Sequence, residues 1–342
     1  MNAPLLCKAF FLLMLPACVF AAPLDALIEA KPSKRYGLGY IEFGTDAMNS
    51  TLDVFDVRSK MSITDGTGNY RGFSLRAGRA FGDGAWVDGA LMSRNITVAT
   101  DLYPVTSWRL GAQQILREDN QAGSALALRA AFWGSQSEKV SKSDFNLDVY
   151  NTSINVDRVS AIKPKDRNYQ LDIVHSWYGD QWSLSLFAGM GSGRVKIPSV
   201  EIDYAGGSYT YPSATLNPFT SISGVSEHLG TLNYDLRSRQ LGLNASYSAG
   251  AWTYRAGYLM ALTSRPSVDD AVQSLGNTPY RRNQTLVGEV AYKFTQSMHI
   301  YSRVQLMQRQ FLSEIPFLYN SITSPIFGVK YGVVSAGLGM SF

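Results

Sequence analysis

The sequence predicts an all-β protein that folds as a single antiparallel transmembrane β-barrel of about twelve strands. Three observations carry this prediction. The carboxyl-terminal residues alternate between apolar and small side chains, similar alternating segments recur in pairs joined by short turns, and no segment after the amino-terminal region approaches about eighteen consecutive apolar residues. A membrane protein built from helices is therefore excluded, whereas a barrel needs an apolar residue only at every second position.

The chain ends on the clearest of these strands. The residues at even-numbered positions, which form one parity of the strand, are all apolar: Val334, Ala336, Leu338, Met340 and Phe342. The residues at odd-numbered positions, which form the other parity, are small or polar: Ser335, Gly337, Gly339 and Ser341. Because consecutive side chains in a strand point to opposite faces, this strand has one apolar face and one small, polar face. Its terminal aromatic residue resembles the signal by which outer-membrane barrels are recognised for insertion, so Phe342 is predicted to act in membrane assembly.

The amino terminus has the features of a secretory signal sequence. A short region containing Lys8 precedes an apolar run over 9–20, which is too short to cross a bilayer as a helix. Small residues then predict cleavage after residue 21, so that 1–21 is a signal peptide and the mature chain starts near Ala22. The segment 15–18 resembles a lipoprotein box, although Pro16 fits it poorly, and lipidation of Cys18 is left open.

Composition excludes several functions. Both cysteines, Cys7 and Cys18, lie in the predicted signal, so the mature chain forms neither a disulfide nor a thiolate metal site. The formal net charge of +4 falls by one when Lys8 is removed, which is too little to indicate nucleic acid as a partner. No cofactor is predicted, and three scattered histidines do not predict a metal site.

The alternating segments define the expected strands and loops. The strands are predicted at 36–46, 70–81, 85–96, 107–117, 124–134, 169–178, 181–195, 240–247, 252–261, 284–294, 299–309 and 327–342. Long polar connections are predicted at 137–167, 196–232 and 262–282, with shorter ones at 97–106 and 311–326. Short turns alternating with long loops are typical of outer-membrane barrels, whose long loops face outwards. The barrel therefore spans 36–342.

Residues 22–35 form a predicted periplasmic leader before the barrel. Leu24, Leu27 and Ile28 have helical spacing, which is compatible with a short helix or plug, and a flexible leader is an equal alternative. Aromatic residues near the short turns predict an interfacial girdle that includes Trp86, Trp182 and Trp252.

The parity opposite to the lipid-facing residues predicts the lumen. Its basic residues are Arg76, Arg94, Arg109, Arg129, Arg255, Lys293, Arg303 and Arg309, and its acids are Asp88, Asp172 and Glu289. Two interpretations remain open. The arginines form a positive ladder that selects anions in a narrow pore, or they pair with the acids in a closed lumen. Asp88 is expected to reach Arg76 across the 82–84 turn, and Arg109 and Arg129 to face each other.

In architecture and charge placement, this barrel resembles the small monomeric outer-membrane channels of Gram-negative bacteria that take up acidic oligosaccharides. The resemblance implies an outer-membrane, porin-like channel for passive diffusion of small anionic or sugar-like solutes. The expected partners are outer-membrane lipid and lipopolysaccharide, the barrel-assembly machinery and a small anionic solute. The alternative function is an accessory or structural barrel with a closed lumen, for example in polysaccharide export.

An outer-membrane lipid- or peptide-modifying enzyme is the least favoured function. His175 and Ser176 are adjacent, so their side chains point to opposite faces of a strand and cannot act as base and nucleophile together. His228 lies in a long connection beside Glu227, and His299 follows a short turn. No catalytic residue is predicted.

Overall fold

The computed structural model describes residues 25–48, 69–82, 84–98, 101–149, 152–213, 232–274, 276–309, 313–320, 324 and 331–342. The predicted signal peptide 1–21, Cys18 and His228 lie outside the described residues.

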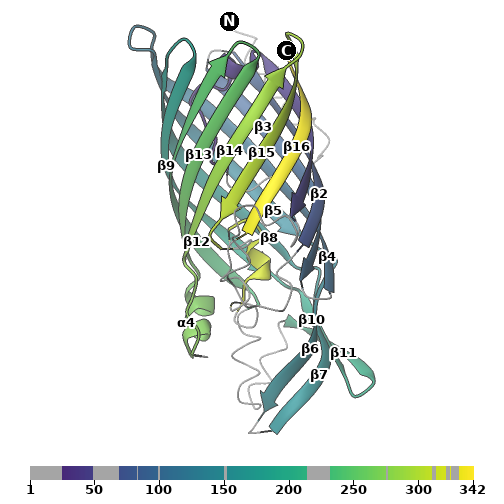
Figure 1. Cartoon of the computed structure of the whole chain (residues 1–342). Coiled ribbons are helices and arrows are strands. Elements are labelled where there is room, and N and C mark those ends of the chain that lie inside the picture. The colour runs from purple at the N-terminus through teal and green to yellow at the C-terminus, as the bar shows by residue number, and fades with distance from the viewer. Residues whose placement is uncertain are drawn as a thin grey trace, which may run out of the picture.

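A closed antiparallel barrel of twelve strands dominates the fold (Figure 1). Its strands are β1 (Gly39–Met48), β2 (Asn69–Phe81), β3 (Ala85–Val98), β4 (Asp101–Asp119), β5 (Ser124–Gln136), β8 (Lys165–Tyr178), β9 (Trp182–Lys196), β12 (Tyr234–Ala249), β13 (Trp252–Ser264), β14 (Arg282–Lys293), β15 (Met298–Met307) and β16 (Tyr331–Ser341). Each lies within or overlaps a predicted strand, so the fold prediction is confirmed.

The last strand closes the barrel against the first. β16 pairs with β1 from Ser341 opposite Tyr40 to Val334 opposite Ala47. Phe342 extends this ladder, because its carbonyl accepts from the backbone N–H of Gly39 at 2.9 Å and its own N–H donates to the Gly39 carbonyl at 2.9 Å. Closure leaves no open sheet edge, which is the condition for a β-structure to exist in lipid.

The connections are short at one end of the barrel and long at the other, as predicted. We call these the short-turn end, where Phe342 lies, and the long-loop end (Figure 1). The predicted loops at 137–167 and 196–232 contain more order than expected. They form a four-stranded sheet in the order β11-β10-β7-β6, from β6 (Lys139–Val149), β7 (Thr152–Ile162), β10 (Ser199–Tyr204) and β11 (Gly207–Pro212).

This second sheet joins two loops that are far apart in sequence. β10 pairs with β7 from Ser199 opposite Ile162 to Asp203 opposite Arg158. Apolar residues at the base of the sheet, including Val200, pack into a cluster at the long-loop end. The connection at 262–282 carries a helix, α4 (Pro266–Ser274), whose buried Val268 and Val272 join the same cluster.

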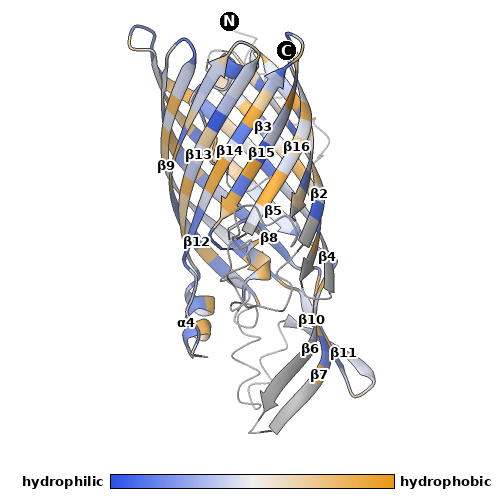
Figure 2. Cartoon of the chain, in the orientation of Figure 1, coloured by the Kyte–Doolittle hydropathy of each residue, from blue (hydrophilic) through white to orange (hydrophobic). Residues whose placement is uncertain are grey.

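The outer face of the barrel is apolar. Along the strands, apolar and polar residues alternate (Figure 2), and the exposed large side chains include Phe43, Phe132, Ile173, Leu241 and Leu286. Among the described residues, no helix is long and apolar enough to cross a membrane.

Exposed aromatic rings lie beside the short turns, and they include Trp182, Trp252 and Phe342. The girdle prediction is wrong for Trp86. This ring is only 4% exposed and stacks on Tyr40 inside the barrel, with ring centroids 6.0 Å apart. Trp86 shares its parity with the inward-facing Asp88, so the strand itself directs the ring into the lumen.

Candidate functional site

Residues 25–31, which we call the inner segment, lie inside the barrel. Wall side chains donate to consecutive backbone carbonyls of the segment: Arg255 to Leu27 (2.7 Å), Asn244 to Ile28 (2.5 Å), and Gln113 to Glu29 (3.0 Å) and Ala30 (2.7 Å). The Ala30 N–H donates to Ser176 Oγ at 2.8 Å. These residues belong to four different strands, so the segment is held by the wall and is not a free leader.

The wall is shaped to fit this segment. Gly257 on β13 faces inward, and a Cβ atom at this position would lie 2.5 Å from the Ala26 carbonyl oxygen and 2.9 Å from the Leu27 side chain. A larger residue at Gly257 would therefore collide with the docked backbone. Ala26, Leu27, Ile28 and Ala30 are all buried, in an apolar cluster with wall residues such as Phe187.

The helix allowed by the spacing of Leu24, Leu27 and Ile28 is not formed over 25–31, and Leu24 lies outside the described residues. One helical turn, α2 (Ser33–Tyr36), follows the inner segment at the short-turn end. Tyr36 stacks on Tyr40 with ring centroids 4.2 Å apart, and Tyr40 stacks in turn on Trp86. Burial raises the pKa of Tyr36 to about 12, and the phenol therefore stays neutral at ordinary pH. Three aromatic rings thus narrow the lumen where the inner segment leaves it.

One bidentate ion pair in the lumen joins two strands that are not neighbours. Arg129 on β5 forms a bidentate pair with Asp88 on β3, at 2.7 and 2.8 Å. The pair crosses β4 above Gly111, where a Cβ atom would lie 2.3 Å from an Arg129 nitrogen. Asp88 and Arg129 therefore pair with each other, and neither makes the contact expected from the sequence. Asp88 lies opposite Gly78 rather than Arg76, and Arg129 lies opposite Gln113 rather than Arg109.

A second ion-pair group surrounds Glu289 on β14. This carboxylate is 4% exposed and lies 2.9 Å from Arg35, 3.5 Å from Arg255 and within hydrogen-bond distance of Arg303. Arg255 also lies 3.4 Å from Glu29 of the inner segment. Glu289 therefore pairs with two arginines of the wall, Arg255 and Arg303. The remaining charged groups are Arg35 of α2 and Glu29 of the inner segment.

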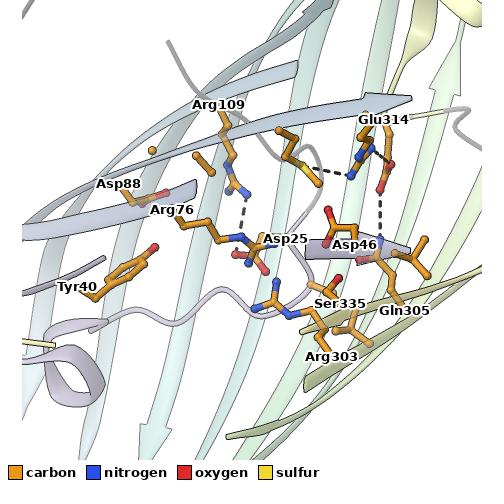
Figure 3. A pocket seen from close by; sticks show the side chains of 17 residues that line it. Asp25, Tyr40, Asp46, Arg76, Asp88, Arg109, Arg303, Gln305, Glu314 and Ser335 are labelled. Atoms are coloured by element: carbon orange, nitrogen blue, oxygen red, sulfur yellow. Dashed lines mark hydrogen bonds and ion pairs between the residues drawn. The ribbon is translucent and has the colours of Figure 1, made fainter. Parts of the chain in front are cut away.

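Asp25 lies in the middle of the lumen, beside a cavity of about 50 Å³. In Figure 3, the guanidinium groups of Arg76, Arg109 and Arg303 point towards its carboxylate. The Arg109–Asp25 ion pair is long, at 3.9 Å, and the other Asp25 oxygen accepts from the Leu27 N–H at 2.9 Å. The Arg76 Nε atom is buried without a hydrogen-bond partner among the described residues.

These arginines keep Asp25 charged. Burial alone would raise the pKa of its carboxyl group, but Arg109, followed by Arg303, Arg76 and Arg255, lowers it by more. The net pKa lies well below the ordinary value of 3.8. Asp25 is therefore an anion held among several cations, although 37% of its side chain remains open to the cavity.

The long-loop end of the lumen is filled by residues 313–320. Glu314 is 3% exposed and lies 2.9 Å from Arg94 and 3.2 Å from Gln305. The short helix η3 (Pro316–Leu318) follows, and the Tyr234 hydroxyl donates to the Pro316 carbonyl at 2.6 Å. Ile315, Phe317 and Leu318 are buried in the apolar cluster at this end, so this connection packs into the barrel mouth and is not a free external loop.

The other predicted lumen residues, Asp172, Lys293 and Arg309, do not belong to the ion-pair groups described above. Asp172 is buried and accepts from the side-chain amides of Gln170 at 2.7 Å and Gln240 at 2.8 Å. Lys293 is exposed at the short-turn end, beside His299. Arg309 lies beyond the end of β15, with its guanidinium 4.5 Å from the centre of the Tyr280 ring.

Several acids of the lumen are not among the predicted residues. Glu42 and Asp46 on β1 are buried and inward-facing, and their parity on the first strand was a signal that could have identified them. Asp25, Glu29 and Glu314 come from segments outside the strands, for which parity gives no information. The lumen is therefore closer to electroneutral than the predicted set of residues indicated.

The histidines do not form a recognisable reaction centre among the described residues. His175 stacks on Trp177, with ring centroids 4.2 Å apart, on the face opposite to Ser176. His299 Nε2 lies 3.3 Å from Glu42. Within the described ranges, no group of three or more potential ligands is placed to hold a metal ion.

Comparison with known proteins identifies the fold. No family model matches the chain, and no curated protein matches it in sequence. The translocator domain of the autotransporter NalP from Neisseria meningitidis is similar in structure, with a TM-score of 0.50, 10% identity, and 90% of this chain and 88% of that chain covered.

A transporter and a porin are similar at lower scores. The toluene transporter TodX of P. putida has a TM-score of 0.47, 9% identity, and coverage of 92% and 93%. The KdgM porin in complex with disordered oligogalacturonate has a TM-score of 0.42, 9% identity, and coverage of 89% and 99%. In fold, the chain is therefore a closed antiparallel β-barrel similar to that translocator domain.

Proposed function

We propose that this protein is a Gram-negative outer-membrane channel through which small anionic or sugar-like solutes diffuse passively. The apolar outer face and the aromatic residues beside the short turns support a membrane location. The expected surroundings are outer-membrane lipid and lipopolysaccharide, and the barrel-assembly machinery is the expected partner during insertion. No catalytic role is proposed.

The distribution of charge in the middle of the lumen supports anions as the solute class. The wall arginines that line this region include Arg76, Arg109, Arg129, Arg255 and Arg303. Within the described residues, their ion pairs with wall acids involve only Asp88 and Glu289. Arg76 and Arg109 therefore have no acid of the wall as an ion-pair partner, and guanidinium groups bind carboxylates and phosphates well.

The test is ion selectivity in planar lipid bilayers containing purified, refolded protein. We expect a current with chloride more permeant than potassium, and a lower chloride preference after the combined substitution of Arg76 and Arg109 by Gln. The matched control is Arg194→Gln, because Arg194 is exposed and pairs with Asp235 outside the lumen. Cation selectivity, or a preference unchanged by the double substitution, would contradict the proposed solute class.

An accessory barrel with a closed lumen is the second candidate. It is favoured by one observation: the inner segment occupies the lumen from one side while 313–320 fills the mouth at the other. This function predicts no current from the unmodified protein or from any variant that displaces the inner segment.

A further inference from the structure

The inner segment lies where a solute would have to pass. Its carbonyls contact β4, β12 and β13, its Ala30 N–H contacts β8, and Asp25 points into the cavity between Arg76, Arg109 and Arg303 (Figure 3). Four strands of the wall thus hold the backbone across the middle of the barrel. A solute cannot pass the docked segment without displacing it.

The contacts of the segment divide into two kinds. The hydrogen bonds to the segment's backbone are short, and at most one of the two groups in each bond is charged. The absence of a side chain at Gly257 makes room for the backbone against the wall. The Asp25 carboxylate is different, because its ion pair with Arg109 is 3.9 Å long and Arg76 Nε has no hydrogen-bond partner among the described residues. The arginines therefore have unused capacity for a better-placed carboxylate.

The cavity beside Asp25 has room for such a group. Its volume is about 50 Å³, compared with about 10–15 Å³, on the same measure, for a cavity that holds one water molecule. Resting on the proposed channel function, we infer that Asp25 occupies the lumen's own carboxylate-binding site, and that a solute carboxylate opens the middle of the lumen by displacing the inner segment.

Acetate is the appropriate probe because it consists of the same carboxylate and single carbon as the aspartate side chain. The readout is thiol labelling of an Ala30→Cys variant by a small maleimide. The chain has no cysteine after Cys18, and Ala30 is fully buried, so a thiol at this position reacts only when the segment leaves its site. Ser297→Cys on an exposed turn at the same end controls for access of the reagent.

Acetate should change the labelling rate differently in the presence and in the absence of Asp25. Replacing chloride by acetate should speed labelling of Ala30→Cys, because acetate competes with Asp25, while neutral acetamide should have no effect. Adding Asp25→Ala should by itself speed labelling about tenfold, as expected for loss of a charged contact. Acetate should then slow labelling or leave it unchanged, because it fills the vacated site without opposing the docked segment.

The outcomes separate this inference from the proposed function. If acetate speeds labelling equally with and without Asp25, or has no effect on Ala30→Cys, the self-occupied site is overturned even when bilayers show anion-selective current. If labelling responds as expected but no variant conducts anions, the site stands and the channel function fails. Equal labelling of Ala30→Cys and Ser297→Cys in the unmodified background would overturn the docked position of the segment.

Discussion

The Asp88–Arg129 pair allows a quantitative test of how the lumen is stabilised. The Arg129 side chain is 5% exposed and that of Asp88 is 14% exposed, and two hydrogen bonds of 2.7 and 2.8 Å join them. Removing one partner of a buried pair leaves an uncompensated charge and costs about 3–5 kcal/mol. Because the adjoining cavity admits water to Asp88, we expect Asp88→Asn and Arg129→Gln each to cost about 3 kcal/mol.

The double variant should be more stable than either single variant. Two neutral amides leave no buried charge, so its cost should be about 1 kcal/mol. Urea unfolding in lipid vesicles, followed by tryptophan fluorescence and heat-modifiable mobility, measures each free energy. Arg194→Gln is the control, since Arg194 and Asp235 form a similar bidentate pair at 2.5 and 3.0 Å that is exposed and should matter little.

Additive losses in the double variant would refute this reasoning, because they would mean that the two side chains act independently. Single losses as small as that of the exposed control would refute it equally, since they would show that the lumen solvates Arg129 as well as bulk water does.

The remaining predictions concern assembly, topology and pH. Deleting Phe342 should sharply lower the yield of folded, heat-modifiable protein without lowering synthesis, because Phe342 extends the closing ladder to Gly39; normal folded yields would contradict this. An epitope tag near Asp148, in the sheet at the long-loop end, should bind antibody on intact cells, and binding only after permeabilisation would reverse the topology. Because the docked pKa of Asp25 lies well below the ordinary value of 3.8, its contribution to docking should be complete above that pH and decline progressively as the pH falls below it towards the docked pKa. Lowering the pH from about 5 to about 3 should therefore increase Ala30→Cys exposure, measured by a spin label at that thiol, but not in Asp25→Ala. A response that survives Asp25→Ala would assign the effect to another group.

The strands could be predicted because their signal is local. Alternating polarity and the glycines at the short turns are set by neighbours in sequence, and the closing strand from Val334 to Phe342 shows both faces without any knowledge of its partner. Parity likewise identified the inward direction of Arg129 and Glu289.

The pairing inside the lumen could not be predicted in the same way. Parity gives the face of a residue but not its height, and a β-bulge between Ile115 and Arg117 shifts the register of the β4–β5 hairpin. Arg109 lies opposite Trp133, four residues along β5 from Arg129, and Arg129 reaches past Gly111 to Asp88. The contacts of Asp25 and Glu314 depend on where irregular segments pack, for which the sequence carries no periodic signal.

The most direct test of the account is the current through a variant that cannot dock the inner segment. Gly257→Val places a side chain where the Ala26 carbonyl and Leu27 lie. Gly288→Val is the matched control, because Gly288 on the neighbouring strand β14 faces outward with no atom within 4 Å of a Cβ. We expect Gly257→Val to conduct more than the unmodified protein, with chloride preferred over potassium, and Gly288→Val to match the unmodified protein. Equal currents in all three proteins, or a cation-selective current in Gly257→Val, would contradict the account.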